Sequence, residues 1–234
     1  MSAEWEVFWN QIQKGAYKTI LNGLLTTVEI AVFGLLIGFV IGTILAIVKV
    51  LPKTNNPVLR VLDKIVTVYV GFFRGTPMTV QLLIGYFVMM PAIHLSLEGV
   101  YVAIAIFGLN SGAYVSEIMR GGINSVDPGQ LEAARALGIG YGRSMIKVVI
   151  PQAFKNILPT MGNEFIALTK DTSIVSFIAV VDVTKAFRSI ADANYEYIIP
   201  YLMLAVVYLV LVALITVLVR VVERRLSRSD RQHK

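Results

Sequence analysis

The chain of 234 residues has no cysteine, only two histidines and few charged residues. Without cysteine, it can form no disulfide framework, no thiol nucleophile and no Cys-ligated metal site. His94 and His233 lie far apart in the sequence, so we expect no metal site. The sequence also lacks a Gx4GK[ST] phosphate loop, an HExxH motif and a GxSxG motif. We therefore expect that the chain is not an enzyme and does not hydrolyse ATP itself.

Charged residues make up 15% of the chain, whereas soluble domains carry about 25%. Hydrophobic residues make up 56%, and they gather in long runs. A helix needs about 20 mainly apolar residues to cross a bilayer, and these runs are too long for the strands of a membrane barrel. The sequence therefore predicts an all-α polytopic membrane protein with five transmembrane helices, at about 20–50, 76–93, 99–119, 157–181 and 197–222.

The segments outside these spans have distinct compositions. Residues 1–19 carry acidic residues and tryptophans, a pattern typical of an interfacial segment outside the membrane rather than of a cleaved signal. Residues 58–73 are moderately apolar but carry several charges, which favours an interfacial or partly buried helix. The expected transmembrane domain covers 20–222 and is followed by a basic tail at 223–234.

The basic residues predict the orientation of the chain. Sixteen of the 21 Lys and Arg residues fall on one side of the five expected spans, and four fall on the other. Basic residues collect on the cytoplasmic side of membrane proteins. We therefore expect the N-terminus outside and the C-terminus inside, which makes the segment 120–156 a cytoplasmic loop.

Three glycines of the first expected span, Gly34, Gly38 and Gly42, recur at every fourth residue. This spacing places them on one helical face, where small residues let a second helix approach closely in lipid. The pattern predicts a helix-packing face.

The cytoplasmic loop predicts a helix–turn–helix. Asp127 is the expected N-cap, Pro128 occupies the first helical position, and Gly138 is the expected C-terminal stop. A second short amphipathic helix is expected to end at Pro151. Short helices outside the membrane indicate an element that docks on another protein.

This loop resembles the EAA loop of bacterial ABC importer permeases, on the residues Glu132, Ala133, Ala134, Gly138, Val148, Ile150 and Pro151. Further motifs are similar to the polar amino-acid subfamily, which includes histidine, glutamine, arginine and cystine permeases. They are Phe73-Arg74-Gly75-Thr76-Pro77 with Gln81, Ala113-Tyr114, Gly129-Gln130 and Lys170-Asp171-Thr172-Ser173. The resemblance covers residues 20–225.

The resemblance implies the type I ABC importer permease fold, located in the bacterial cytoplasmic membrane. It implies three kinds of partner: an ATP-binding cassette ATPase dimer, a second permease chain and an extracytoplasmic solute-binding protein. ATP and Mg would be bound by the ATPase, so no cofactor is expected in this chain. The residues implied to couple the chain to the ATPase are Glu132, Ala133, Ala134, Gly138, Tyr141 and Gly142.

The fourth expected span is unusually polar, and charged side chains in the membrane normally face protein or water. A zwitterionic amino acid needs an acceptor for its ammonium and donors for its carboxylate. The residues proposed to line its pathway are Asn110, Glu164, Lys170, Asp171, Thr172 and Ser173. The alternative is an internal ion pair of Lys170 with Glu164 or Asp171 that only fixes helix packing, and Asn110 is equally compatible with a satisfied buried amide.

Two other functional classes compete with an importer subunit. The absence of catalytic motifs disfavours an intramembrane enzyme. A secondary transporter usually carries more spans or an inverted repeat, and neither is evident here. Which amino acid is moved, whether the permease pair is homo- or heteromeric, and how many membranes the host has are not encoded in these motifs.

Overall fold

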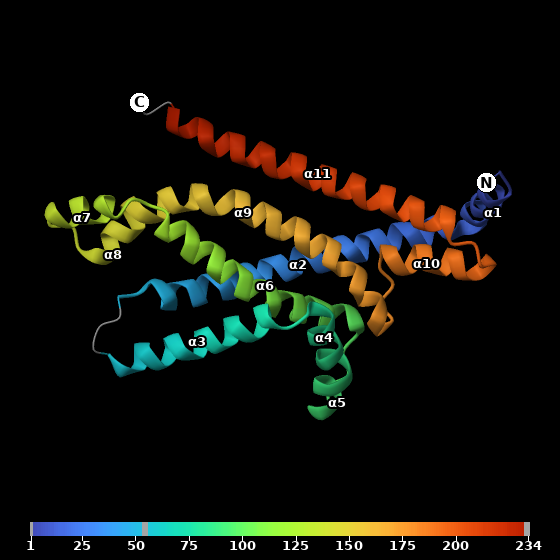
Figure 1. Ribbon diagram of the computed structural model, residues 1–234, viewed down its shortest axis with the longest axis horizontal. Coiled ribbons are helices and arrows are strands. Elements are labelled where there is room, and N and C mark those ends of the chain that lie inside the picture. Colours follow the sequence, from blue (N-terminus) through green and yellow to red (C-terminus); the bar gives the residue numbers. More distant parts are fainter. Residues whose placement is uncertain (1, 53–55, 232–234) are drawn as a thin grey trace.

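The computed structural model describes residues 2–52 and 56–231, and these form one elongated helical bundle (Figure 1). The elements include short π-helical turns (η1 to η3) and a 3₁₀ helix (η4). In chain order they are α1 (Ser2–Gln11), η1 (Ile12–Ala16), α2 (Tyr17–Val50), α3 (Pro57–Gly75), α4 (Met78–Leu83), η2 (Ile84–Met89), α5 (Met90–Ala92), α6 (Gly99–Asn124), α7 (Pro128–Ala136), α8 (Tyr141–Ser144), η3 (Met145–Val149), α9 (Ile150–Asp171), η4 (Thr172–Ile178), α10 (Val183–Asn194) and α11 (Ile198–Arg231).

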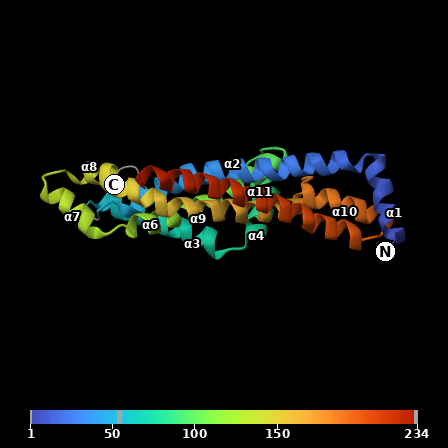
Figure 2. The same ribbon diagram turned by 90° about the horizontal axis from the view of Figure 1, so that it is seen from above.

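The four long helices α2, α6, α9 and α11 run along the long axis of the bundle. Helices α7 and α8 lie at one end, while α1 and α10 lie at the other, and Figure 2 shows the same separation from above. The start of α1 and the end of α11 also lie at opposite ends of the bundle. Helices α4 and α5 project sideways from its middle. The end with α7 and α8 is called the loop end below.

Within the described residues, three helices are long and apolar enough to cross a membrane: Glu4–Val50, Gly99–Asn124 and Ile198–Arg225. They correspond to the first, third and fifth expected spans. The second expected span, 76–93, forms a shorter apolar helical segment, Met78–Ala92, that starts after Pro77. Helix α9 begins at Ile150, before the expected start at 157, and gives way to the 3₁₀ helix η4 after Asp171.

The glycine face of α2 packs directly against α6, as its spacing predicts. A Cβ atom added to Gly38 would lie 2.6 Å from the Cβ of Ser111, and one added to Gly42 would lie 2.6 Å from the Cβ of Val115. The fit is reciprocal, because a Cβ added to Gly112 of α6 would lie 2.7 Å from a methyl carbon of Ile41. Small residues on both helices thus bring the two backbones close together.

Helix α3 lies beside α2 and α6 in the bundle. Its polar groups turn toward these neighbours: Asp63 pairs with Lys49 of α2 at 3.3 Å, and the Tyr69 hydroxyl donates to the Leu109 carbonyl of α6 at 2.6 Å. Apolar side chains such as Val68, which is 72% exposed, point outward. Residues 58–73 are therefore helical, as expected, and part of this helix is buried against α2 and α6.

The end opposite the loop end is held by a buried carboxylate. Asp182 caps α10, accepting hydrogen bonds from the backbone N–H groups of Thr184 and Lys185. Burial raises the pKa of the Asp182 carboxyl, while these hydrogen bonds oppose that shift. The adjacent Val183 N–H donates to the Thr27 hydroxyl of α2, which ties α10 to the bundle.

The expected basic tail, 223–234, continues helix α11 as far as Arg231. Residues 232–234 lie outside the described residues, and so do residues 53–55, between α2 and α3.

Candidate functional site: coupling helices and a polar helix face

The sequence correctly predicts the first helix of the loop. Asp127 is the N-cap of α7, and its carboxylate accepts a hydrogen bond from the Gly129 N–H at 2.8 Å. Pro128 occupies the first helical position. Helix α7 ends two residues before Gly138, whose φ of +81° lies in the left-handed region that glycine adopts without strain.

The exposed surface of α7 includes a residue that the motif does not contain. Glu132, Ala133 and Gly138 are exposed, whereas Ala134 is buried and packs α7 against the rest of the chain. Leu137 is 82% exposed at the tip of the turn. Leu137 follows the exposed residues of the motif, so it adds an apolar side chain to the surface that they form. Its position next to the helix-ending glycine is the sequence signal that could have found it.

The prediction that the second loop helix ends at Pro151 is wrong. Helix α8 begins at Tyr141 and continues through the π-turn η3 into α9, with Pro151 near the start of α9. The π-turn shifts the hydrogen-bond ladder by one residue, since the Ile150 N–H donates to the Met145 carbonyl. Because proline lacks an N–H and clashes with the preceding turn, this altered ladder lets the helix pass without a break.

Tyr141 and Gly142 place the second loop helix against the end of α2. The Tyr141 hydroxyl donates to the Val50 carbonyl at 3.4 Å. Both residues line an apolar cavity of about 520 Å³ between α2 and the start of α9. The second loop helix therefore contacts both α2 and α9, so a movement of the loop would act directly on these two long helices.

Helix α9 carries a polar stripe along its exposed side. At about 100° per residue, five exposed polar residues fall within one narrow face. They are Asn156, Thr160, Asn163, Lys170 and Asp171. Among the described residues, Lys170 has no ion-pair partner within 4.0 Å, so the structure gives no support to the packing alternative within one chain.

The remaining predicted pathway residues of this region are less accessible. Glu164 is part-buried and accepts a hydrogen bond from the Ser111 hydroxyl of α6 at 3.1 Å. Thr172 is fully buried and donates to the Thr169 carbonyl, while Ser173 is part-buried in η4. The structure thus brings Lys170 and Asp171 to the surface and holds Glu164 beside them against α6.

Asn110 is a satisfied buried amide. Its Nδ2 donates to the Gln81 Oε1 at 2.9 Å and to the Phe73 carbonyl at 3.2 Å. Gln81 in turn donates to the Phe73 carbonyl and to Thr76. The two amides satisfy the carbonyl groups left free where α3 ends before Pro77, so this network fixes the α3–α4 break to α6.

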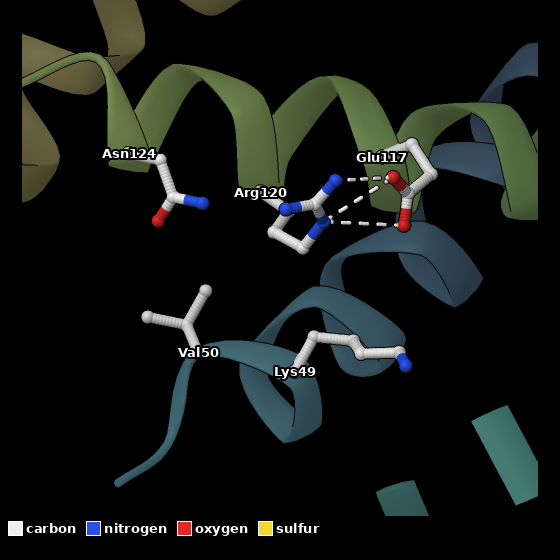
Figure 3. Close-up of a pocket in the computed structure, with 5 residues that line it drawn as sticks. All are labelled: Lys49, Val50, Glu117, Arg120 and Asn124. Atoms are coloured by element: carbon white, nitrogen blue, oxygen red, sulfur yellow. Dashed lines mark hydrogen bonds and ion pairs between the residues drawn. The ribbon is translucent and has the colours of Figure 1, made fainter. Parts of the chain in front are cut away.

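A charged cluster lies on α6 near the loop end (Figure 3). Arg120 donates hydrogen bonds to the Glu117 carboxylate, with a shortest distance of 2.7 Å and further bonds from Nε. Arg74 of α3 approaches Glu117 from another side at 3.9 Å and lies 5.3 Å over the Tyr114 ring. The sequence places these residues in spans or at their ends but gives no signal that they meet.

Glu117 separates two cavities. The first, of about 420 Å³, is lined by Lys49, Val50, Glu117, Arg120 and Asn124 (Figure 3). The second, called the Arg74 cavity here, has a volume of about 460 Å³ and is lined by Arg74, Tyr114, Glu117, Ile118, Gly121, Gly122, Ser125, Asn156 and Thr160. Because Asn156 and Thr160 also belong to the polar stripe of α9, the stripe leads into the Arg74 cavity.

Residues 38–228 match the family of binding-protein-dependent transport system inner membrane components. The chain belongs to this family. It is 40% identical over 211 residues to the arginine transport system permease protein ArtQ of Bacillus subtilis (strain 168), covering 90% of this chain and 94% of that one. It is 41% identical over 211 residues to a putative glutamine transport system permease protein of Rickettsia bellii (strain RML369-C), again covering 90% and 94%. The L-cystine transport system permease protein TcyB of Bacillus subtilis (strain 168) is 34% identical over 94% of this chain and 92% of its own length.

A solved amino acid ABC transporter, crystallised with histidines, has a chain that superimposes on this permease with a TM-score of 0.83 at 34% identity. The match covers 93% of this chain and 98% of that one. The inward-facing MetNI methionine ABC transporter shares the fold, with a TM-score of 0.73 at 18% identity over 90% and 97% of the two chains. The protein is therefore a membrane permease subunit of an amino acid ABC importer with the type I permease fold.

Proposed function

We propose that this permease crosses the bacterial cytoplasmic membrane five times, with the loop end in the cytoplasm, and forms part of the pathway for a polar amino acid. The polar stripe of α9 carries this proposal. A charged side chain that faces hydrocarbon at the membrane centre costs at least about 2.5 kcal/mol, so such side chains normally face protein or water. The stripe therefore faces a water-filled path, which a second permease chain completes.

Chemistry on this stripe suits a zwitterion. Lys170 can attract a carboxylate, Asp171 can accept hydrogen bonds from an ammonium, and both side chains are exposed in the single chain. Glu164, held by Ser111, adds a second carboxylate close to the stripe. Relatives named as arginine, glutamine and cystine permeases support a polar amino acid as the transported solute.

Helices α7 and α8 are proposed to dock into a separate ATP-binding cassette ATPase. Exposed Glu132, Ala133 and Leu137 would form the contact, and the continuous path from α8 through η3 into α9 would carry its motion to the polar stripe. ATP and Mg would be bound by the ATPase, and an extracytoplasmic solute-binding protein would deliver the amino acid to the opposite end.

Co-purification with the candidate ATPase tests this proposal. Leu137→Arg should abolish the complex and ATP-dependent uptake, because it places a charge at the tip of the docking turn. Leu137→Met, which keeps an apolar side chain of similar size, should retain both. An unchanged complex and unchanged uptake in Leu137→Arg would exclude this docking surface. Uptake by the wild type without any ATPase would favour a secondary transporter.

A further inference from the structure

We propose that the Arg74 cavity is an inner binding site for the transported amino acid, in which Arg74 binds the α-carboxylate and Glu117 binds the α-ammonium. The inference rests on the proposed import function and adds a second station to it, nearer the loop end than the charged residues of α9. It is distinct from Lys170 and Asp171, which lie at the far end of the same helix.

The size and lining of the cavity suit a small polar solute. The cavity is a shallow depression that is open to the surface in the single chain, and its volume of about 460 Å³ falls within the range of about 300–1,000 Å³ that is usual for small-molecule sites. Two of its nine lining residues are charged, and they carry opposite signs. One wall of the cavity thus offers a cation, Arg74, for the carboxylate of a zwitterion and an anion, Glu117, for its ammonium.

The ion pair of Arg74 with Glu117 is loose. The Arg74 Nη1 and Glu117 Oε2 atoms are 3.9 Å apart, a contact much longer than the 2.7 Å bond between Arg120 and the same oxygen. Arg120 therefore fixes the Glu117 carboxylate from the other cavity, as Figure 3 shows, while Arg74 is only loosely paired. An amino acid that lies across the pair on the cavity side, with its carboxylate on Arg74 and its ammonium on Glu117, adds two charge-assisted hydrogen-bonded pairs.

Arg74 is held ready for a carboxylate. Its guanidinium lies over the Tyr114 ring at 5.3 Å. This cation–π contact restricts the position of the guanidinium and leaves its N–H donors free for a ligand. The planar fork of those donors matches the two oxygens of a carboxylate. Arg120 is a positioning residue in this arrangement, because it acts on the ligand only through Glu117.

The rest of the lining predicts broad tolerance of side chains. Gly121 and Gly122 form part of the wall, and Ser125 and Asn156 bond to each other at 2.8 Å. Among the residues that the structure describes, no third charged residue lines the cavity, so recognition would depend on the α-amino and α-carboxyl groups common to all amino acids. The site would therefore hold any substrate that the outer half of the pathway admits.

The route into the site is the polar stripe itself. Asn156 and Thr160 belong to both the stripe and the cavity lining, so a solute that leaves Lys170 and Asp171 follows polar groups to Arg74.

Equilibrium binding to the purified, nucleotide-free complex tests the site, with radiolabelled arginine and glutamine as probes and no solute-binding protein present. We expect Arg74→Gln to weaken the inner site at least tenfold while the station at Lys170 and Asp171 still binds the probe. Arg74→Lys, which keeps the charge but loses the fork, should restore part of the inner-site binding. Gly121→Leu should weaken binding as strongly without removing either charge. A Cβ atom at this position would have nothing within 4 Å, so the leucine side chain can extend into the cavity and occupy the space of the ligand. Agmatine, which lacks the carboxylate, should compete poorly with arginine.

Lys64→Gln and Gly71→Leu are matched controls on α3, since both positions are exposed and neither lines the cavity. They should bind the probes like the wild type. Wild-type binding by Arg74→Gln and Gly121→Leu, or loss of all binding in Asp171→Asn alone, would overturn the inner site. ATP-dependent uptake by the same wild-type preparation separates the outcomes: if uptake is present, only the inner site fails, and if it is absent, the import function fails as well.

Discussion

Gly38 of α2 and Ser111 of α6 lie in such close contact that a Cβ atom on Gly38 would be 2.6 Å from both the Cβ and the Oγ of Ser111. The same Ser111 hydroxyl donates to Glu164 of α9. One small-residue contact therefore connects the packing of the two central helices with a carboxylate beside the polar stripe.

We predict that Gly38→Leu destabilises the permease by about 1–3 kcal/mol, the usual cost of overpacking a closely packed interface. Gly71→Leu, at an exposed position with nothing within 4 Å, should leave the stability unchanged. Thermal unfolding of the two variants in detergent measures the difference. Equal unfolding temperatures would show that the α2–α6 contact does not limit stability.

The carboxylates near the end of α9 should be required for transport but not for assembly. Asp171→Asn removes the charge that we expect to meet the ammonium, so uptake and substrate-stimulated ATPase activity should fall at least tenfold while the complex with the ATPase stays intact. Glu164→Gln should lower uptake in the same way. Wild-type uptake and stimulation in Asp171→Asn would remove Asp171 from the pathway.

Gly138 should tolerate only residues that adopt positive φ. With φ at +81°, a β-branched residue is strained, whereas asparagine enters this region more readily. We expect Gly138→Val to destabilise the end of α7 by about 1–2 kcal/mol and to reduce coupled ATPase activity, and Gly138→Asn to retain most of it. Limited proteolysis of the loop, compared between the two variants, reports the local change. Identical digestion patterns would contradict the conformational argument.

How far the sequence predicts this structure depends on the range of the interactions. The α7 N-cap at Asp127, the glycine stop and the glycine face of α2 were predicted correctly because each is encoded within a few residues of chain. The continuity of the helix through Pro151 was predicted wrongly. It depends on hydrogen bonds that deviate from a regular helix, which composition does not reveal.

The candidate site shows the same division. Polar residues on one face of α9 could be read from helical periodicity, but the meeting of Arg74, Tyr114 and Glu117 could not, because it joins residues 40 or more positions apart. Asn110 was left open between the pathway and a buried amide. Only its contacts with Gln81 and Phe73 decide for the amide.

The Asn110 contacts give the last prediction. Asn110→Leu introduces an apolar side chain of similar size and removes the two hydrogen bonds that Asn110 donates. The Gln81 amide oxygen and the Phe73 carbonyl then have fewer partners. An unsatisfied buried polar group costs about 1–3 kcal/mol, so the variant should unfold at a lower temperature than the wild type. The double variant Asn110→Leu with Gln81→Leu should be less destabilised than the sum of the two single variants, because each change removes a partner that the other leaves unpaired. Additive effects would mean that the two amides do not act as one network, and the α3–α4 break would then depend on Pro77 alone.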